Sequence, residues 1–333
     1  MELRSIYRPI ENDLKRIDEI LDFSLKKSKS KPILGMGKFL LESPGKRIRP
    51  ALVILSARAS SGHRPFEVKG SLTKIASAME LIHMASLVHD DVIDHAGIRH
   101  NKPTVNSRWG EDVSIALGDY LFAEAFELIS GCGNSDIIRC LSSATKTMCE
   151  GELLQVCERD NLDLLKERYL VIIKKKTAMF FASSCHAGAL ISDSNRALQK
   201  ALKAYGLNFG IAFQIVDDYL DLIGAEENLG KMPGQDVGVG EMTLPILNLL
   251  ESVSGDKRKE LKELLSFKND RNALDRIKTR LFEANIGLKT KKLVSSYMDI
   301  AKSKIEALSD SPYKESLLNL ADFVIDRGFN AQG

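Results

Sequence analysis

Two acidic motifs of the same form, D-D-x-x-D, interrupt apolar stretches of the chain. The first runs from Asp90 to Asp94 and the second from Asp217 to Asp221. At about 100° per residue, the first and last aspartates of each motif project from nearly the same side of a helix. Three carboxylates on one turn of a mostly buried helix repel one another and are costly to desolvate unless cations neutralise them. Each motif therefore predicts a divalent-cation site.

The donor atoms of the motifs indicate which metal they would bind. Carboxylate oxygens favour Mg²⁺ or Mn²⁺, and the nearby histidines at 89, 95 and 100 make zinc only a minor alternative because they surround an oxygen site. A single acidic cluster could equally be a solvated helix end, but two matching copies make that interpretation poor. Mg²⁺ usually binds through a few carboxylates together with substrate phosphates. Two facing motifs therefore predict a metal-bridged diphosphate substrate.

Two basic segments could complete an anion site. Residues 45–50, G-K-R-I-R-P, lie at an expected junction of loop and helix, where an anion could also meet backbone N–H groups. Residues 174–177, K-K-K-T, lie on an otherwise apolar helix. Taken alone, each segment is more simply a solvated basic surface.

Helical periodicity accounts for most of the chain. Apolar residues from Ile10 to Leu25 recur at spacings of three and four and form one stripe. Runs that alternate with the period of a strand are scarce, so the predicted class is all-α. Further helices are expected over roughly 33–41, 50–59, 67–92, 112–130, 135–156, 166–191, 196–222 and 244–252, with four more after Lys257.

The predicted helices form one domain. Those at 67–92 and 196–222 are long and apolar around much of their girth, as expected in the middle of a large bundle. Neither a solenoid repeat nor a low-complexity linker divides residues 1–333. Two long loops, at 95–108 and in the glycine-rich stretch 224–240, are candidate lids or binding elements.

Composition excludes several classes of protein. Lys and Arg total 47 against 45 Asp and Glu, so the net charge of +2 provides no broad field for nucleic acid. Five cysteines without a C-x-x-C pair fit neither a zinc ribbon nor a disulfide framework and suit a reducing cytosol. The sequence shows no signal-peptide core and no run of about twenty apolar residues that could span a bilayer. We therefore expect a cytoplasmic protein without an integral membrane segment.

These motifs occur with several others in a specific order. In chain order they are G-K-R-I-R-P at 45–50, E-L-I-H at 80–83, the first acidic motif, Arg99, K-P-T at 102–104, G-D-Y-L at 118–121, K-T at 176–177, Q-x-x-D-D-x-x-D at 214–221, G-K at 230–231 and T-L-P at 243–245. Over roughly residues 30–250 the chain resembles the trans-isoprenyl diphosphate synthases, the polyprenyl synthetase family, and in particular the bacterial long-chain type. The resemblance implies the isoprenoid synthase fold: one large helical bundle around a deep central cavity, with the acidic motifs facing each other across its mouth, usually in a homodimer.

The resemblance also implies a role for each matching position. The metal would be Mg²⁺, with three ions in each active site, or Mn²⁺ in its place. Its ligands would be Asp90, Asp91, Asp94, Asp217, Asp218 and Asp221. The catalytic residues would be Asp90, Asp94, Lys176 and Asp217. The residues that bind the allylic diphosphate would be Arg99, Lys176, Thr177, Gln214 and Lys231. The residues that bind isopentenyl diphosphate would be Lys46, Arg49 and His83, with His100 at a further position of that site.

Two positions depart from the family pattern. His100 replaces an arginine that normally helps to bind isopentenyl diphosphate, and imidazole is largely neutral at pH 7. Glu241 replaces a lysine after the glycine-rich loop, which reverses a charge directed at phosphate. Both changes predict weaker diphosphate binding or an altered reaction.

Product length is expected to depend on Ala85 and Ser86. In the family, bulky aromatic residues at these two positions close the floor of the cavity and stop chain growth early. Because both residues are small here, we expect a hexaprenyl to octaprenyl product, with a peripheral membrane contact for product release.

Three functions remain open from the sequence. The favoured one is Mg²⁺-dependent head-to-tail condensation of isopentenyl diphosphate with an allylic diphosphate. The second is a terpene cyclase or diphosphate lyase of the same fold, which His100 and Glu241 favour slightly and Lys46, Arg49 and His83 oppose. The third is a non-catalytic synthase subunit, which two complete acidic motifs oppose strongly.

Overall fold

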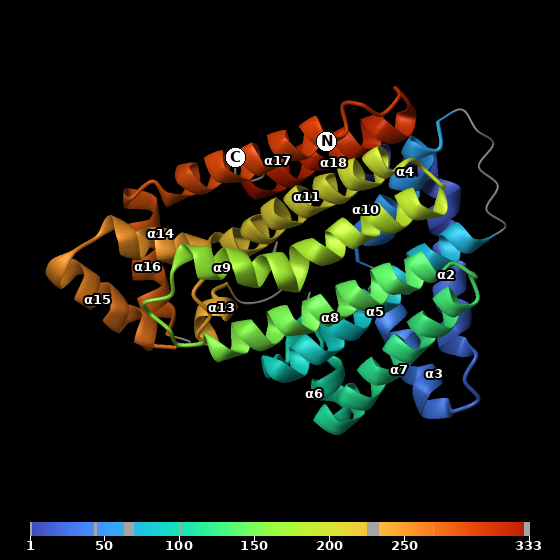
Figure 1. The fold of residues 1–333 in the computed structure, drawn as a ribbon. Helices are drawn as coiled ribbons and strands as arrows, with labels where there is room; N and C mark the ends of the chain where they lie inside the picture. Colours follow the sequence, from blue (N-terminus) through green and yellow to red (C-terminus); the bar gives the residue numbers. More distant parts are fainter. Residues whose placement is uncertain are drawn as a thin grey trace. The chain divides into compact units, whose positions relative to one another are not determined.

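The computed structural model describes residues 2–42, 45–62, 70–99, 101–224, 233–268 and 270–329 (Figure 1). Almost all the regular structure in this part of the chain is helical, and the only strands there are β1 (Ile98–Arg99) and β2 (Lys102–Pro103), which pair antiparallel. The all-α prediction is therefore confirmed. The helices are α1 (Leu3–Ile6), η1 (Arg8–Ile10), α2 (Glu11–Lys26), α3 (Lys31–Leu41), α4 (Ile48–Ser60), α5 (Ser71–Ile93), α6 (Val105–Trp109), α7 (Glu111–Ser130), α8 (Ser135–Cys157), α9 (Lys166–Ile173), η2 (Lys174–Ala178), α10 (Met179–Ile191), α11 (Arg196–Ile223), α13 (Gln235–Gly238), α14 (Leu244–Ser252), α15 (Gly255–Ser266), α16 (Arg271–Glu283), α17 (Ile286–Lys304) and α18 (Pro312–Phe329).

Contacts along the chain define two compact units. The first consists of Met1–Thr145, Phe181–Gly206 and Ser303–Leu320, and the second of Lys146–Phe180, Leu207–Lys302 and Ala321–Gly333. Helices α8, α10, α11, α17 and α18 each contain residues of both units. The single domain over residues 1–333 and its central cavity stay predictions.

In the first unit, α5 is the central helix. It packs against α2, α4, α6 and α7. Nearly every residue of α5 from Leu72 to Ala85 is buried, as its all-round apolar sequence predicts. A second close contact joins α4 and α10, where a Cβ on Gly188 would lie 2.3 Å from the carbonyl oxygen of Val53. Only glycine permits that approach, so the two backbones determine the residue type.

The second unit contains the second acidic motif, near the end of α11. Here α9 packs on α14, and both α14 and α15 pack on α16. Gly287 at the start of α17 lies against Tyr219 of α11, because a Cβ on this glycine would be 2.3 Å from the tyrosine hydroxyl. The C-terminal part of α18 also contacts α11 through Gly328, which lies against Val216.

The structure corrects several predicted boundaries. The helix expected over 166–191 is divided into α9 and α10 by the π-helical turn η2 at Lys174–Ala178. The loop expected over 95–108 contains the β1–β2 hairpin and α6, and the end of the loop expected over 224–240 contains α13. The helix expected from residue 67 begins at Ser71, and residues 63–69 lie outside the described part.

The sequence predicts neither a membrane-spanning helix nor a disulfide framework, and the described residues bear on both expectations. Within that part of the chain, no helix is both long and apolar enough to cross a membrane. All five cysteines are free thiols.

Candidate active site

The first acidic motif ends α5, and its middle aspartate is buried. Asp91 is 5% exposed. Nε of Arg99 donates to Oδ1 of Asp91 at 2.7 Å. The main-chain carbonyl of Asp91 accepts hydrogen bonds from the backbone of Ala96 at 2.9 Å and from Nδ2 of Asn106 at 3.2 Å. The chain after α5 therefore folds back over the motif and brings Arg99 to it.

Both motifs lie where the helix dipole adds negative potential. Asp94 is the C-cap of α5, and Asp221 lies two residues before the end of α11. Neither helix has a basic residue in its last turn. Carboxylates at the C-terminal end of a helix face the negative end of its dipole, which is unfavourable. A cation beside each motif would relieve both this interaction and the repulsion among the aspartates.

The second motif is tied to the neighbouring helix through its middle aspartate. The hydroxyl of Tyr169 on α9 donates to Oδ2 of Asp218 at 2.5 Å, and Nε2 of Gln214 donates to Oδ1 at 2.7 Å. The hydroxyl of Thr177 donates in turn to Oε1 of Gln214 at 2.7 Å. The structure thus joins three predicted site residues, Thr177, Gln214 and Asp218, in one hydrogen-bonded chain.

Asp218 is an unusual carboxyl group. Burial raises its pKa from 3.8 to about 7, and the charges of Asp217 and Glu241 act in the same direction. The hydrogen bonds from Tyr169 and Gln214 lower the pKa but do not offset the loss of water. At neutral pH this aspartate is therefore partly protonated.

The outer aspartates of the second motif have different partners. Oδ1 of Asp217 lies 2.7 Å from Nη1 of Arg327 on α18. Asp221 is 3% exposed, and its Oδ2 accepts the backbone N–H of Asp236 at 3.1 Å. Its carbonyl oxygen accepts the N–H of Gly234 at 2.7 Å. The glycine adopts a φ of 80°, which allows the chain to turn back onto the motif.

The π-helical turn η2 carries the two predicted residues Lys176 and Thr177. A Cβ on Gly151 of α8 would lie 2.2 Å from the backbone nitrogen of Lys176, so α8 approaches this turn closely. Nζ of Lys176 pairs with Oε2 of Glu152 at 2.5 Å, while Oε1 of the same glutamate is buried without a hydrogen-bond partner. Short π-helical segments occur often at functional sites. Here the turn directs Thr177 into the Asp218 network.

The predicted isopentenyl diphosphate residues gather around a turn at Gly45–Arg47 in the first unit. Arg47 has a φ of 51°, and it bonds Glu80 at 2.7 Å and Asp18 at 3.0 Å. The hydroxyl of Tyr7 donates to the carbonyl oxygen of Lys46 at 3.0 Å. The N-terminal helices therefore hold this turn at two points.

His83 stands among cationic side chains. Burial holds its pKa well below 6.5, and the charges of Arg49, Arg99 and Arg47 lower it further. The imidazole is therefore neutral at pH 7. The guanidinium of Arg49 also lies 4.4 Å from the centre of the Phe181 ring. A neutral imidazole with arginines close by is chemically suited to bind a polyanion.

In a comparison with models of known protein families, residues 30–282 match the polyprenyl synthetase family. The chain belongs to the polyprenyl synthetase family. It is 35% identical to a short chain isoprenyl diphosphate synthase of Methanothermobacter thermautotrophicus, over 94% of this chain and 97% of that protein. It is 30% identical to an octaprenyl diphosphate synthase of Haemophilus influenzae, over 99% and 98% of the two chains. A crystal structure of polyprenyl synthase from Caulobacter crescentus complexed with calcium and isoprenyl diphosphate superposes with a TM-score of 0.92, at 32% identity and 98% coverage of both chains.

These matches confirm the predicted family and its isoprenoid synthase fold. As a polyprenyl synthetase, the protein is a prenyltransferase.

In this polyprenyl synthetase the unusual Glu241 is neutralised locally. Its side chain is 10% exposed, and Oε1 lies 3.2 Å from Nη2 of Arg159. Nε2 of Gln155 donates to its other carboxylate oxygen. The negative charge that Glu241 introduces is thus paired with Arg159 of the same unit.

Two predicted substrate residues, His100 and Lys231, lie outside the described residues. Their roles stay predictions.

The aspartates of the two motifs in this polyprenyl synthetase are the type of ligand that suits magnesium, but the side chains of neither motif converge on one point. Among the described residues, no group of three or more His, Cys, Asp or Glu side chains converges as a metal centre. Asp91, Asp217 and Asp218 instead have protein partners. Six carboxylates at two helix C-termini are nevertheless the ligands that Mg²⁺ prefers. A cation at Asp217 would compete with the guanidinium of Arg327 for that carboxylate.

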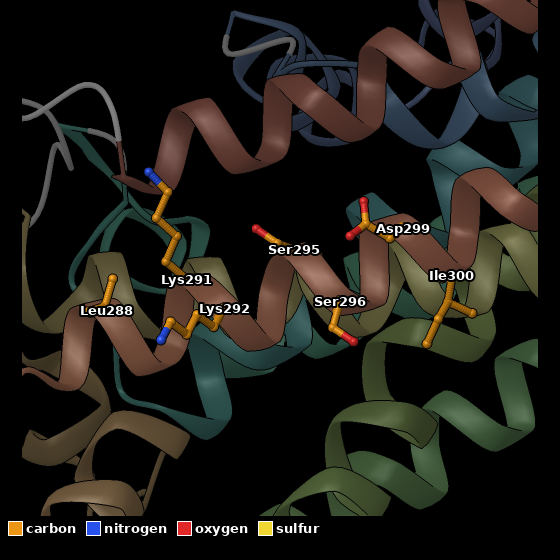
Figure 2. Close-up of a pocket in the computed structure, with 7 residues that line it drawn as sticks. All are labelled: Leu288, Lys291, Lys292, Ser295, Ser296, Asp299 and Ile300. Carbon is orange, nitrogen blue, oxygen red and sulfur yellow. The ribbon is translucent and has the colours of Figure 1, made fainter.

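A depression elsewhere on the second unit is unrelated to these residues. Figure 2 shows that its lining comes from one helix, α17. The lining residues are Leu288, Lys291, Lys292, Ser295, Ser296, Asp299 and Ile300. Because it is wide open and contains no predicted site residue, we do not assign the reaction to it.

Sequence reasoning missed four side chains that support the site. Tyr169 lies seven residues before Lys176, so two helical turns place it on a related face, and periodicity could have revealed it. Tyr7, Glu152 and Arg327 carry no comparable signal, because only the folded chain brings them to Lys46, Lys176 and Asp217.

Proposed function

We propose that this polyprenyl synthetase is a magnesium-dependent trans-polyprenyl diphosphate synthase. It would condense isopentenyl diphosphate head to tail with an allylic diphosphate. The observation that carries the proposal is the pair of D-D-x-x-D motifs, each at the C-terminal end of a helix that lacks a terminal basic residue. Such sites favour cations and, through them, a diphosphate.

The side chains divide into three roles under this proposal. Asp90, Asp94 and Asp217 would bind Mg²⁺ directly, with Asp91, Asp218 and Asp221 as further ligands or as supports. Arg99, Lys176, Thr177, Gln214 and Lys231 would hold the allylic diphosphate. Lys46, Arg49, His83 and His100 would hold isopentenyl diphosphate. The Mg²⁺ ions, three per site or replaced by Mn²⁺, would supply positive charge for the departing pyrophosphate.

The reaction requires no nucleophilic side chain. The allylic C–O bond breaks, and the cationic side chains stabilise the negative charge of the pyrophosphate that leaves. The double bond of isopentenyl diphosphate attacks the allylic cation, which forms the new C–C bond. A proton is then lost from the adjacent carbon, and the released pyrophosphate can accept it. A dry apolar surround protects the cation from water.

The product is proposed to be hexaprenyl to octaprenyl in length. Named relatives do not decide the length, because they include a short chain synthase, a geranylgeranyl synthase, a heptaprenyl synthase component and octaprenyl synthases. The support for a long product is that Ala85 and Ser86 are small. A homodimer, for which the family resemblance is the only support, and a cytoplasmic location, which the five cysteines without a C-x-x-C pair favour, complete the proposal.

The test is an incubation of the purified chain with Mg²⁺, labelled isopentenyl diphosphate and farnesyl diphosphate, followed by product chromatography. We expect label in a long polyprenyl diphosphate, and no product in excess EDTA. Asp90→Asn and Asp217→Asn should each lower the rate by about a hundredfold or more, because each removes a charge on which the transition state depends. Asp193→Asn, at an exposed aspartate outside the motifs, is the matched control.

The same incubation separates the other functions. Consumption of farnesyl diphosphate without uptake of label would indicate a cyclase or diphosphate lyase. No consumption of either substrate would indicate a non-catalytic subunit. Either result would overturn the proposal.

A further inference from the structure

The region from α15 to α17 is far more basic than the chain as a whole. Residues 255–304 contain fourteen Lys and Arg against seven Asp and Glu, although the whole protein has a net charge of only +2. The rest of the chain must therefore be net negative. A charge asymmetry of this kind indicates a surface for an anionic partner.

Large apolar side chains are exposed in the same region, around the turn between α16 and α17. Phe282, near the end of α16, is 86% exposed, and Leu288, near the start of α17, is 56% exposed. Their helices bury other faces, since Ile277 and Leu281 of α16 and Ile286 of α17 are almost inaccessible. Both side chains are therefore directed away from the apolar core of the second unit.

Lysines flank these two apolar side chains. Lys278 lies one helical turn before Phe282, while Lys289 follows Leu288 directly and Lys292 lies one turn after it. Figure 2 shows Leu288 and Lys292 near each other along α17. We call Lys278, Phe282, Leu288, Lys289 and Lys292 the basic–aromatic surface.

The three lysines of this surface form no ion pair within the described residues. Other basic side chains of α16 do, since Arg276 and Arg280 pair with Glu260 at 2.7 and 2.5 Å. The acidic side chains nearby are Asp275, one helical turn before Lys278, Glu283, beside Phe282, and Asp299, farther along α17. Lys289 and Lys292 therefore face solvent and Lys278 is partly buried, in a region where basic residues outnumber acidic ones by fourteen to seven.

Another exposed phenylalanine shows that the combination is specific. Phe23 of α2 is 69% exposed and also has lysines close in sequence. Those lysines are neutralised, because Lys26 pairs with Asp22 at 2.7 Å and Lys27 with Glu127 at 2.6 Å. Of the two regions, around Phe23 and around Phe282, only the basic–aromatic surface combines an exposed aromatic ring with lysines that form no ion pair among the described residues.

The chemistry of this surface fits an anionic membrane better than other partners. Aromatic and aliphatic side chains flanked by lysines on an exposed helix end are typical of interfacial membrane contacts. A second copy of the same surface would bring like charges together, which is unfavourable. Nucleic acid would use the charge and could stack on Phe282, but it offers little to an exposed leucine.

We propose that the basic–aromatic surface docks the protein on an anionic lipid bilayer, with Phe282 and Leu288 entering the headgroup region. The biological reason rests on the proposed function, because a long polyprenyl chain is insoluble in water and needs a membrane on release. Helix α16, which carries two residues of this surface, also contacts the turn beside the second acidic motif. Leu274 on α16 lies against Gly234, whose N–H donates to the carbonyl oxygen of Asp221 at 2.7 Å.

The test is flotation of the full chain with lipid vesicles, without substrate. Phosphatidylcholine vesicles are compared with vesicles in which about a third of the lipid is phosphatidylglycerol, at low and at high salt. We expect binding to the anionic vesicles alone and release by salt. Replacing Lys278, Lys289 and Lys292 together with Gln should weaken binding by about a hundredfold, and Phe282→Ser by about tenfold.

Matched variants separate this surface from general effects of charge and apolar exposure. Gln at the exposed positions Lys146, Lys200 and Lys203 changes the net charge equally, and Phe23→Ser removes another exposed ring. Both controls should bind as the wild type does. Equal losses in the controls, or no binding by the wild type, would overturn the proposal. Binding of a soluble RNA through the same lysines without vesicle binding would also overturn it in favour of nucleic acid.

Failure of the docking proposal can be told apart from failure of the proposed function. If the chain binds anionic vesicles but makes no prenyl product, the proposed function is wrong and the docking surface remains. If the chain makes product but does not bind vesicles, only the docking proposal is wrong. In addition, anionic vesicles should raise the steady-state turnover of the wild type but not that of the triple lysine variant, while a single turnover without vesicles proceeds equally in both.

Discussion

The aspartates within each acidic motif are held in different ways. The middle residues, Asp91 and Asp218, are buried and bonded to Arg99 and to Tyr169, respectively. The first aspartate of each motif is less buried and stands nearer to solvent. The motif pattern alone treats the three positions as one group of ligands, and only burial and hydrogen bonding distinguish them. We therefore expect the middle positions to support the motifs and the first positions to provide the more accessible ligands.

Asp218 should make the metal-free protein less stable as pH rises. Its pKa is about 7 in the folded chain against 3.8 otherwise, so the folded state binds the extra proton. The stability from this group is complete below about pH 4 and is lost as pH rises through about 7, at no more than about 1.4 kcal/mol per pH unit. Thermal unfolding in EDTA should therefore show a smaller decline between about pH 5 and 8 for Asp218→Asn than for the wild type. Asp193→Asn is the control, and curves parallel to the wild type for Asp218→Asn would contradict the assignment.

Tyr7 should affect isopentenyl diphosphate and not the allylic substrate. It precedes the family match, which begins at residue 30, yet its hydroxyl bonds the carbonyl of Lys46. One such bond contributes about 0.5–1.5 kcal/mol, so Tyr7→Phe should raise the KM for isopentenyl diphosphate by about two- to thirteenfold. Steady-state kinetics with each substrate varied in turn measures this, with Tyr297→Phe as the control. An equal rise in both KM values would mean that the tyrosine only stabilises the fold.

At the scale of elements, the sequence predicted most helices but not their interruptions. Apolar residues at spacings of three and four identify α2, because burying one face requires that period, whereas length and apolar residues around much of the girth identify α5 and α11. The π-helical turn at Lys174–Ala178 leaves no such mark, since K-K-K-T is compatible with an uninterrupted helix. Another helix contacts the turn there, because Gly151 allows α8 to reach the backbone of Lys176.

Gly151→Ala should disturb this turn. The added Cβ would lie 2.2 Å from the backbone nitrogen of Lys176, so either α8 or the turn must move. We expect a lower melting temperature and a loss of activity of at least about tenfold, because small displacements of positioned groups are costly to catalysis. Gly131→Ala is the matched control, since its nearest neighbour would be 3.8 Å away and its φ is −71°. Activity and stability at wild-type levels in Gly151→Ala would show that the contact is unimportant.

At the scale of the whole molecule, the family could be predicted because its motifs are distributed over most of the chain. Residues 30–282 match the family, in agreement with the expected span of about 30–250. The distribution of charge was not apparent from the total of +2, because an excess of lysine and arginine in residues 255–304 offsets an acidic remainder. Product length is also a property of the whole molecule, since it depends on how far a growing chain extends before it meets a side chain.

Residue 86 gives the cleanest test of product length. Ser86 lies one helical turn before Asp90 on α5 and is partly exposed. Among the described residues its hydroxyl bonds only within the helix, to the carbonyl of His83 at 2.8 Å. Ser86→Phe should shorten the wild-type product by several isoprene units because the ring blocks growth, whereas Ser86→Ala removes the same bond without adding volume and should leave the length unchanged. Ala85→Phe should shorten the product too, but Ala85 is fully buried, so overpacking should also lower stability by about 1–3 kcal/mol. Chromatography of the products with farnesyl diphosphate as primer measures all four proteins. If the wild type already stops at geranylgeranyl diphosphate, a deeper residue such as Met79 or Ile82 must set the limit, because neither residue 85 nor residue 86 has the bulk to do so.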